Sequence, residues 1–314
     1  MDVARKAVHE RVLRLGSEGH LVAIATDPPA PLAAPGVIFL NAGVLHRVGP
    51  HRLHVLLARR LAAAGFAAVR MDLSGIGDSS PVPSGMSFRA SSVADVRAAM
   101  DGLGSEGAGA RFVLFGLCSG ADNALATAIA DPRVAGLVLI DGVRAPLGEG
   151  LLIDPPAYAT PQARWRRRRL SLRDPAYLLS LPQRAAQAVA RRIRRYWSAL
   201  AVRGEAHANA APAPGRQPPP LPEYRRDLLA LVERGVRILA IYSGVMGDRY
   251  NAQGQFHEFL PELRGRIELA WFPHANHTFT ERAAQAELAD TVMAWIEKHG
   301  AASWQRVAPA GAVR

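Results

Sequence analysis

The only cysteine of the 314-residue chain stands at the centre of a Gly-x-Cys-x-Gly pentapeptide, Gly116-Leu117-Cys118-Ser119-Gly120. An apolar run precedes it and a stretch of small residues follows it. A strand, a tight turn and a helix form the setting in which a strained turn lifts a nucleophilic side chain clear of a sheet. Glycines are needed on both sides because a Cβ there would collide with the turn. Cys118 is therefore the candidate nucleophile, and the alternative interpretation is a structural cysteine at a crowded strand end.

The surroundings of Cys118 are expected to favour attack by its sulfur. The helix after the turn would direct its free N–H groups and the positive end of its dipole at the thiol, which favours the thiolate. Ser119 lies one position past the apex, so it is a poor nucleophile, but its backbone N–H can stabilise a developing oxyanion. We expect the second oxyanion donor to be the N–H of Ala42 or Gly43, in a loop after a predicted strand.

A cysteine nucleophile needs a base, and the base needs an orienting acid. The candidates lie after predicted strands, at the sheet edge that carries the sites of open α/β sheets. We expect His277, directly before the last predicted helix, to be the base in preference to His274. Asp248 is the expected acid, although a solvated turn aspartate is the alternative. Asp141, at the end of the preceding predicted strand, is the substitute acid.

Other polar residues follow the same predicted strands. Val44, His46 and Arg47 are expected to contact substrate or line the mouth of the pocket, and a surface or capping role is equally open for His46. The glycine-rich loop 72–79 is interpreted as a structural turn beneath the site. The sequence holds no metal-ligand cluster with usable spacing, no dinucleotide fingerprint and no phosphate loop, so neither a metal nor a cofactor is expected.

The elements that position these residues alternate along the chain. Predicted strands lie at 9–15, 21–26, 36–40, 67–71, 112–115, 134–140, 237–242 and 266–272, and predicted helices at 50–64, 91–103, 121–130 and 280–299. In the first helix, Leu53, Leu56, Leu57 and Leu61 form the apolar side. This rhythm predicts an α/β fold with a doubly wound, mostly parallel sheet.

The alternation breaks at 143–225. Fifteen arginines and five acidic residues fall there, which accounts for most of the net charge of +11. We expect this segment, with a helix at 183–201, to be a cap inserted into a core formed by 1–142 and 226–300, and we expect 301–314 to be a flexible tail. The arginines form either a solvated surface over an apolar lid or a docking face for an acidic partner, such as an acyl carrier protein or a CoA ester.

Several classes of protein are disfavoured by composition. Arginines without a reading motif are weak evidence for nucleic-acid binding. No run has the length of a membrane span, no apolar signal region follows the N-terminus, and one cysteine cannot form an intramolecular disulfide. We therefore expect a soluble cytoplasmic protein without stable membrane insertion.

The motifs together resemble the α/β-hydrolase superfamily. They are the pentapeptide at Cys118, the Asn41-Ala42-Gly43 loop, the loop 72–79 and the Asn-His-Thr-Phe loop at 276–279. The run 41–50 more narrowly resembles the serine-aminopeptidase-like group, which includes the exosortase-system-associated hydrolases. The resemblance covers about 10–142 and 226–298. It implies a mostly parallel eight-stranded sheet with helices on both faces and a cap after the sixth strand.

Carried over to matching positions, the resemblance makes Cys118 the nucleophile, Asp248 the acid and His277 the base. Most members use serine, and cysteine at the apex resembles the dienelactone-hydrolase-like enzymes. The expected function is an acyl hydrolase or acyltransferase of esterase or thioesterase type, acting on a small-molecule acyl substrate through an acyl-cysteine. The alternatives are a lactone or dienelactone hydrolase and a catalytically inactive binding protein for an acyl carrier or ligand.

Overall fold

The computed structural model describes residues 8–32, 34–82, 85–105, 111–142, 219–244, 254–299 and 304. They belong to one compact unit, formed by Met1–Glu149 and Pro218–Arg314. The expected cap lies outside the described residues up to 218, as does Asp248. The helix α7 (Leu221–Glu233) begins within the last residues of the predicted insertion and packs against the core through its buried Tyr224, Leu228 and Leu231.

In the described part of the chain, eight strands form one sheet in the order β1-β2-β4-β3-β5-β6-β7-β8. The strands are β1 (His9–Leu15), β2 (Leu21–Asp27), β3 (Gly36–Phe39), β4 (Ala68–Met71), β5 (Phe112–Leu117), β6 (Val134–Ile140), β7 (Arg237–Ser243) and β8 (Glu268–Phe272). The β1–β2 and β2–β4 pairs are antiparallel, and the strands from β4 to β8 run parallel. The predicted mostly parallel α/β sheet is confirmed.

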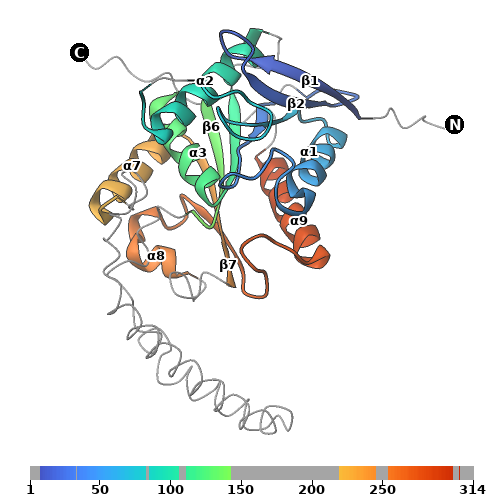
Figure 1. Cartoon of the computed structure of the whole chain (residues 1–314). Helices are drawn as coiled ribbons and strands as arrows, with labels where there is room; N and C mark the ends of the chain where they lie inside the picture. Colours follow the sequence, from blue (N-terminus) through green and yellow to red (C-terminus); the bar gives the residue numbers. More distant parts are fainter. Residues whose placement is uncertain are drawn as a thin grey trace, which may run out of the picture. The chain divides into compact units, whose positions relative to one another are not determined.

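Helices cover both faces of this sheet (Figure 1). On one face, α1 (Leu53–Ala63) and α9 (Arg282–Lys298) share a hydrophobic cluster with β3, β5 and β6. On the other, α2 (Phe88–Ser105), α3 (Ser119–Ala130) and α7 pack into a second cluster. The short helix α8 (Gln255–Phe259) and the 3₁₀ turn Pro261–Leu263 precede β8. Another 3₁₀ turn, Pro50–Arg52, leads into α1.

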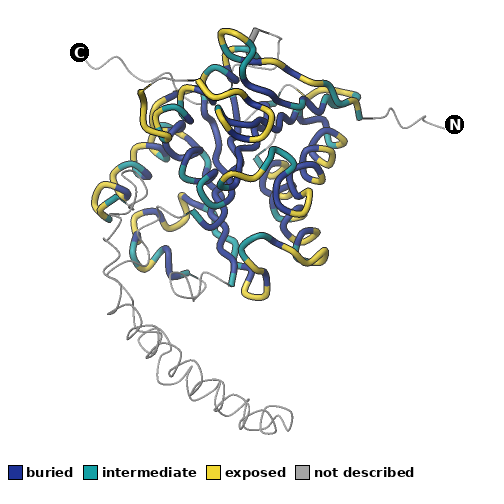
Figure 2. The backbone as a smooth tube through the Cα atoms, viewed as in Figure 1, coloured by how far each residue is buried: buried dark blue, intermediate teal, exposed yellow. Residues whose placement is uncertain are grey.

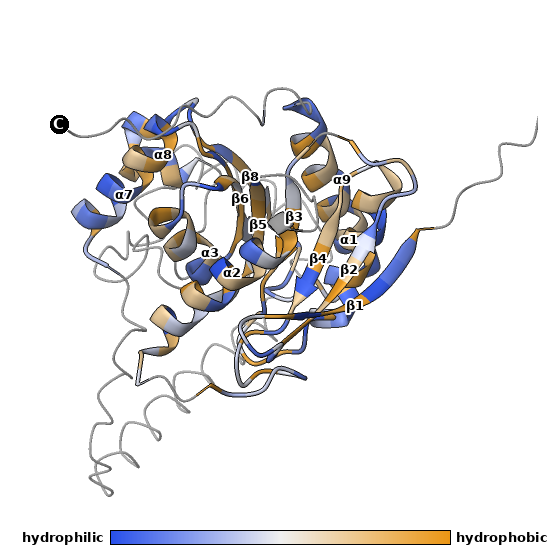
Figure 3. Ribbon diagram, turned by 90° about the horizontal axis from the view of Figure 1, so that it is seen from above, coloured by the Kyte–Doolittle hydropathy of each residue, from blue (hydrophilic) through white to orange (hydrophobic). Residues whose placement is uncertain are grey.

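The burial of the strands follows from this layering. Every residue of β5 and β6 is buried, as expected for central parallel strands covered on both faces (Figure 2). The edge strand β1 instead alternates between exposed and buried residues at its end, and Figure 3 shows hydrophilic and hydrophobic positions along it. The apolar centre therefore fixes β3, β5 and β6, whose carboxyl ends carry the residues singled out by the sequence, whereas β8, which leads to His277, is the partly buried strand at the other edge.

Two side chains differ from their sequence-based expectations. Leu56, placed on the apolar side of the first helix, is 49% exposed, whereas Leu53, Leu57 and Leu61 are buried. Trp304, within the segment expected to be a flexible tail, is 1% exposed and packs edge-on against Trp295. A Cβ at Gly136 would meet the Trp304 ring at 2.7 Å, so the small residue in β6 makes room for the indole.

Across the described ranges, no helix combines the length and the apolar character needed to cross a membrane.

Candidate active site

The turn between β5 and α3 has the strained geometry predicted for Cys118. This residue lies in the left-handed region, with φ 59° and ψ −125°, and it directly precedes the first turn of α3. Its N–H donates to the carbonyl of Ile140 on β6 at 2.9 Å, and its own carbonyl accepts from Ala121 at 3.0 Å. A non-glycine residue adopts such a conformation only where its surroundings impose it. The thiol is free and partly exposed at the carboxyl edge of the sheet.

The two glycines of the pentapeptide have the steric role inferred from the sequence. A Cβ at Gly116 would lie 2.2 Å from backbone atoms of Gly120. A Cβ at Gly120 would lie 2.7 Å from the carbonyl oxygen of Asn41, in the loop after β3. Both contacts are with backbone, which cannot move aside as a flexible side chain can. The glycines therefore let three segments meet at the apex: the end of β5, the start of α3 and the loop after β3.

The residue that contacts His277 is Asp141. His277 Nδ1 lies 3.0 Å from Asp141 Oδ2, and the carboxylate is completely buried. Ser243, at the end of β7, fixes that carboxylate with two further hydrogen bonds: its N–H donates to Oδ1 at 2.8 Å and its hydroxyl to Oδ2 at 2.6 Å. Asp141 itself lies in the left-handed region, with φ 47°. The substitute acid named from the sequence is thus held firmly against the imidazole.

The other hydrogen-bond partner of His277 is the side chain of Cys118. The hydrogen bond to Asp141, and then the one to Cys118, raise the pKa of His277 from its usual 6.5 to about 10, although burial opposes the change. Because the folded protein supplies acceptors for the His277 ring, it favours the protonated, charged form of the imidazole over the neutral form. Its stabilisation is complete below pH 6.5 and is lost as the pH rises through about 10. Near neutral pH, a positive imidazolium therefore lies beside the sulfur.

The remaining acid and base candidates have different positions. Asp248 lies outside the described residues. His274 is in the same loop as His277 but is exposed, and it has no hydrogen-bond or ion-pair partner among the described residues. The sequence reasoning ranked Asp141 second because a strand end alone does not show how far its side chain reaches. In the structure, Asp141 on β6 contacts the loop after β8 from two strands away, with Ser243 of β7 between them.

The two oxyanion candidates in the loop after β3 differ in whether their backbone N–H groups are already hydrogen-bonded. The N–H of Gly43 donates to the hydroxyl of Ser119 at 2.8 Å, so it is engaged. The N–H groups of Ala42 and Ser119 have no acceptor in the part of the chain that the structure describes. Ala42 and Ser119 are therefore better placed than Gly43 to donate to a substrate oxygen, and Ser119 also contributes by fixing the loop through its side chain.

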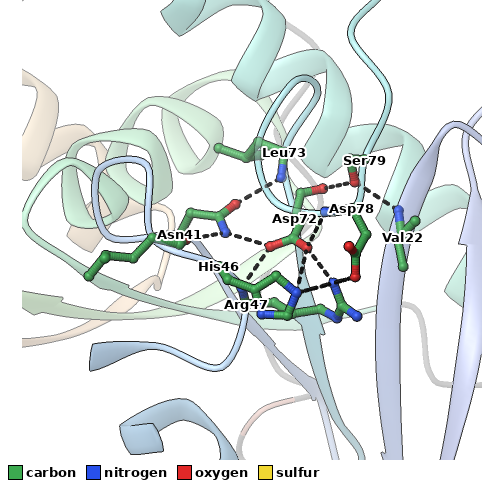
Figure 4. A network of polar contacts seen from close by, with 9 residues as sticks. Val22, Asn41, His46, Arg47, Asp72, Leu73, Asp78 and Ser79 are labelled. Atoms are coloured by element: carbon green, nitrogen blue, oxygen red, sulfur yellow. Dashed lines mark hydrogen bonds and ion pairs between the residues drawn. The ribbon is translucent and has the colours of Figure 1, made fainter. Parts of the chain in front are cut away.

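His46 and Arg47 lie in a partly buried polar network around Asp72, which Figure 4 shows in detail. The Asp72 carboxylate is fully buried and accepts from the Arg47 N–H at 2.7 Å, from the Asn41 amide at 2.8 Å and from the Arg47 guanidinium. The amide oxygen of Asn41 in turn accepts from the N–H of Leu73 at 2.8 Å. This network joins the loop after β3 to the loop after β4, which agrees with the structural role inferred for 72–79.

These contacts change the interpretation of the three predicted substrate-binding residues. Arg47 Nη1 lies 2.7 Å from Asp78 Oδ2, and His46 Nε2 lies 3.3 Å from the same oxygen. The polar atoms of both residues are thus directed at aspartates of the neighbouring loop. Arg47 lowers the pKa of Asp78 by hydrogen bonding, and His46 contributes in the same way. Val44 is 83% exposed, so its side chain remains available at the mouth of the site.

The same network contains the donor set of a possible cation site. One ligand atom from each of His46, Asp72 and Asp78 lies within 4.8 Å of the others. However, the guanidinium of Arg47 binds both carboxylates and already supplies the compensating positive charge. A divalent cation would have to displace that side chain, which is only 12% exposed. The arrangement therefore fits an internal ion pair better than a metal centre.

Comparison with known proteins places the chain in a family. Residues 21–291 match the alpha/beta hydrolase family, and the chain belongs to it. The chain is therefore an enzyme with hydrolase-type activity. No curated protein matches the chain in sequence.

Solved structures share the fold at low sequence identity. An esterase from Pyrococcus furiosus is 13% identical, with a TM-score of 0.55, over 93% of this chain and 91% of the esterase. A thermophilic esterase from Thermogutta terrifontis, in a malate-bound structure, is 18% identical, with a TM-score of 0.52, over 92% of this chain and 98% of that one. A puromycin-hydrolyzing peptidase of Mycobacterium tuberculosis is 16% identical, with a TM-score of 0.52, over 95% of this chain and 40% of the peptidase.

Replacement of the two candidate acids is expected to separate them. Asp141→Asn should lower the acylation rate roughly 10²- to 10⁴-fold, because the amide can no longer hold the His277 Nδ1 proton as an anion does. Asp248→Asn should stay near the wild-type rate and is the matched control. The check is single-turnover acylation by an activated ester. A larger loss in Asp248→Asn would return the role of acid to Asp248. Thermal melting of both variants would detect loss of structure.

Proposed function

We propose that the protein cleaves ester or thioester bonds of small acyl substrates through a Cys118–His277–Asp141 triad and a covalent acyl-cysteine. The observation that carries this proposal is the 3.0 Å pairing of His277 with the buried Asp141, together with the interaction of His277 with Cys118 at the strained turn after β5. A purely structural role for the cysteine would not explain why a partly exposed histidine lies beside it and is oriented by a buried carboxylate. The order nucleophile, acid, histidine along the chain also agrees with the family.

In the first half-reaction, the Cys118 sulfur attacks the acyl carbon as a thiolate. The carbonyl oxygen gains negative charge and accepts hydrogen bonds from the N–H groups of Ser119 and Ala42. As the tetrahedral intermediate collapses, the bond to the alcohol or thiol breaks, and protonated His277 donates its proton to the leaving group. Asp141 keeps Nδ1 protonated, so Nε2 is the nitrogen that exchanges the proton. The product is an acyl-cysteine with neutral His277.

In the second half-reaction, neutral His277 removes a proton from water, and the water oxygen attacks the thioester carbon. The carbon–sulfur bond then breaks, the carboxylic acid leaves, and the thiolate and imidazolium are restored. A bound alcohol, thiol or amine in place of water would give acyl transfer by the same steps. Thiolates suit thioesters, activated esters and lactones better than unactivated amides, so the proposed substrates are drawn from those three classes.

Intact-protein mass spectrometry tests this function. The protein is mixed with a panel of acyl-CoA thioesters, p-nitrophenyl esters and lactones and quenched in acid after short times. We expect at least one substrate to add the mass of its acyl group, with peptide mapping to Cys118. Cys118→Ala treated in parallel is the control for labelling elsewhere. An adduct on another residue, or turnover by Cys118→Ala, would contradict the assignment. Absence of any adduct and any turnover across the panel would favour the inactive binding protein.

A carrier-bound acyl group remains part of this proposal through the arginine-rich segment. The positive surplus of the sequence lies in 143–225, while Cys118, Asp141 and His277 lie outside it. A cationic segment of this kind would accelerate the capture of CoA esters or acyl carrier proteins and leave the bond-making step unchanged. The comparison of acyl-CoA with uncharged esters in the same panel, at low and high salt, measures that preference.

A further inference from the structure

The described core contains a second concave surface, between α1 and α9, which the proposed chemistry does not use. We call it the α1–α9 groove. It has a volume of about 610 Å³, within the range of small-molecule sites. Apolar side chains from both helices line it: Leu53, Leu56 and Leu57 from α1, and Ala286 and Ala289 from α9. The two helices lie side by side on one face of the sheet, as Figures 1 and 3 show.

The lining forms two matching stripes, apolar except for Arg60 on α1 and for Arg282 and Gln285 on α9. Positions 53, 56, 57 and 60 on α1 follow helical spacing, as do 282, 285, 286 and 289 on α9. Each stripe covers two helical turns, roughly 10 Å at 1.5 Å per residue. Leu56 is 49% exposed in this lining, although it lies among buried leucines of α1. The groove thus offers an elongated apolar surface that suits an alkyl chain.

The charges of the groove are almost all positive. Arg52 and Arg282 line it where α1 and α9 begin, and neither has an acidic partner among the described residues. Arg60, at the other end of the α1 stripe, is already paired with Asp290. The residues lining the groove include no carboxylate. Two unpaired guanidinium groups beside an apolar floor are complementary to an anion with a hydrocarbon tail.

The backbone at this end of the groove is strained. His51 and Arg52 both have positive φ, at 49° and 64°, and neither is glycine. Non-glycine residues with positive φ are conformationally strained, and such strain occurs mostly at ligand-binding and switch positions. His51 Nε2 also lies 3.2 Å from Thr280 Oγ1, which follows the loop of His277. This contact joins the start of α1 to the segment that leads into α9.

We propose that the α1–α9 groove binds an alkyl carboxylate, with the carboxylate at Arg52 and Arg282 and the chain along Leu56 and the α9 alanines. The site is separate from Cys118, and binding requires no covalent step. A free medium-chain fatty acid is the ligand class that matches the length, the apolar lining and the charge. The proposal stands independently of the proposed esterase function.

Isothermal titration with octanoate tests the site, with acetate and octan-1-ol as probes of the head and the chain. All titrations use Cys118→Ala protein, so that events at the sulfur do not contribute. We expect saturable octanoate binding, weaker octan-1-ol binding and no measurable acetate binding. Arg282→Gln and Arg52→Asn should each weaken octanoate binding about five- to tenfold, as expected for the net loss of one solvent-exposed hydrogen bond, and leave octan-1-ol unchanged. Leu56→Asn should weaken both.

Two exposed residues elsewhere provide matched controls. Arg264→Gln removes the same charge from the 3₁₀ turn before β8, and Ile129→Asn removes a 39%-exposed apolar side chain from α3. Both should bind octanoate as the parent protein does. If Arg282→Gln and Arg264→Gln weakened octanoate binding equally, net charge alone would explain the loss of affinity, and the proposal would be overturned. Absence of saturable octanoate binding would overturn it directly, whatever the outcome of the acyl-adduct experiment at Cys118.

Discussion

Cys118→Ala is expected to abolish turnover of every ester or thioester that the wild-type protein cleaves. The loss should be roughly 10³- to 10⁶-fold in kcat, because removal of a nucleophile removes the covalent pathway and leaves only binding and the oxyanion donors. The fold should be retained, since the sulfur is partly exposed and the turn depends on its glycines. Steady-state kinetics, with thermal melting as the structural control, provide the measurement.

The variant Cys118→Ser tests whether the site can activate an alcohol in place of the thiol. It should retain little activity, because an alcohol must be deprotonated as it attacks, and His277 already carries its proton near neutral pH. Most members of the α/β-hydrolase superfamily use serine at this position. Substantial activity in Cys118→Ser would therefore show that this site activates alcohols too. Full activity in Cys118→Ala would remove Cys118 from the mechanism altogether.

His277→Ala is expected to have the second largest effect. Loss of the acid and base should slow acylation roughly 10²- to 10⁴-fold. The variant should also react more slowly with iodoacetamide at pH 6.5, because the imidazolium that stabilises negative charge on the Cys118 sulfur is gone. In the wild-type protein the pKa of His277 is raised to about 10, so the fast alkylation should persist from pH 6.5 through neutral pH.

His274→Ala is the matched control for both measurements. It removes an exposed imidazole from the same loop, three positions away, and should react with ester and with iodoacetamide at the wild-type rate. The reverse order of effects would mean that His274 is the functional histidine. Wild-type alkylation no faster than that of a free thiol at pH 6.5 would contradict the activation of Cys118 by His277.

The residues that could be predicted from the sequence are those whose role depends on local structure. The pentapeptide at Cys118 specifies a strand, a turn and a helix within residues 112–130, and its glycines have the steric role expected of them. The parallel sheet followed from alternating apolar strands and amphipathic helices, and it is confirmed. His277 was distinguished from His274 by its position directly before the last helix, and the structure places it against Cys118 and Asp141.

Features that depend on tertiary contacts were beyond such reasoning. The reach of Asp141 past β7 depends on the left-handed backbone at its own position and on Ser243, neither of which a strand pattern predicts. The helix α7 is absent from the predicted helices because a run of prolines, 218–220, stands directly before it, although Tyr224, Leu228 and Leu231 have helical spacing. The burial of Trp304 depends on ring contacts with Trp295 and His299 and on the space above Gly136, none of which the sequence near the C-terminus indicates.

The contacts that assemble the site join residues very far apart in the chain. The bond from Gly43 to Ser119 spans 76 positions, that from Ser243 to Asp141 spans 102, and that from His277 to Asp141 spans 136. Contacts of such separation are entropically costly to close and form late, once most of the sheet exists. A partly folded chain or a fragment that lacks β8 would therefore carry the cysteine turn without the histidine that activates its sulfur. Enzymatic competence would arrive as the final, all-or-none event of folding, not gradually with the growth of the core.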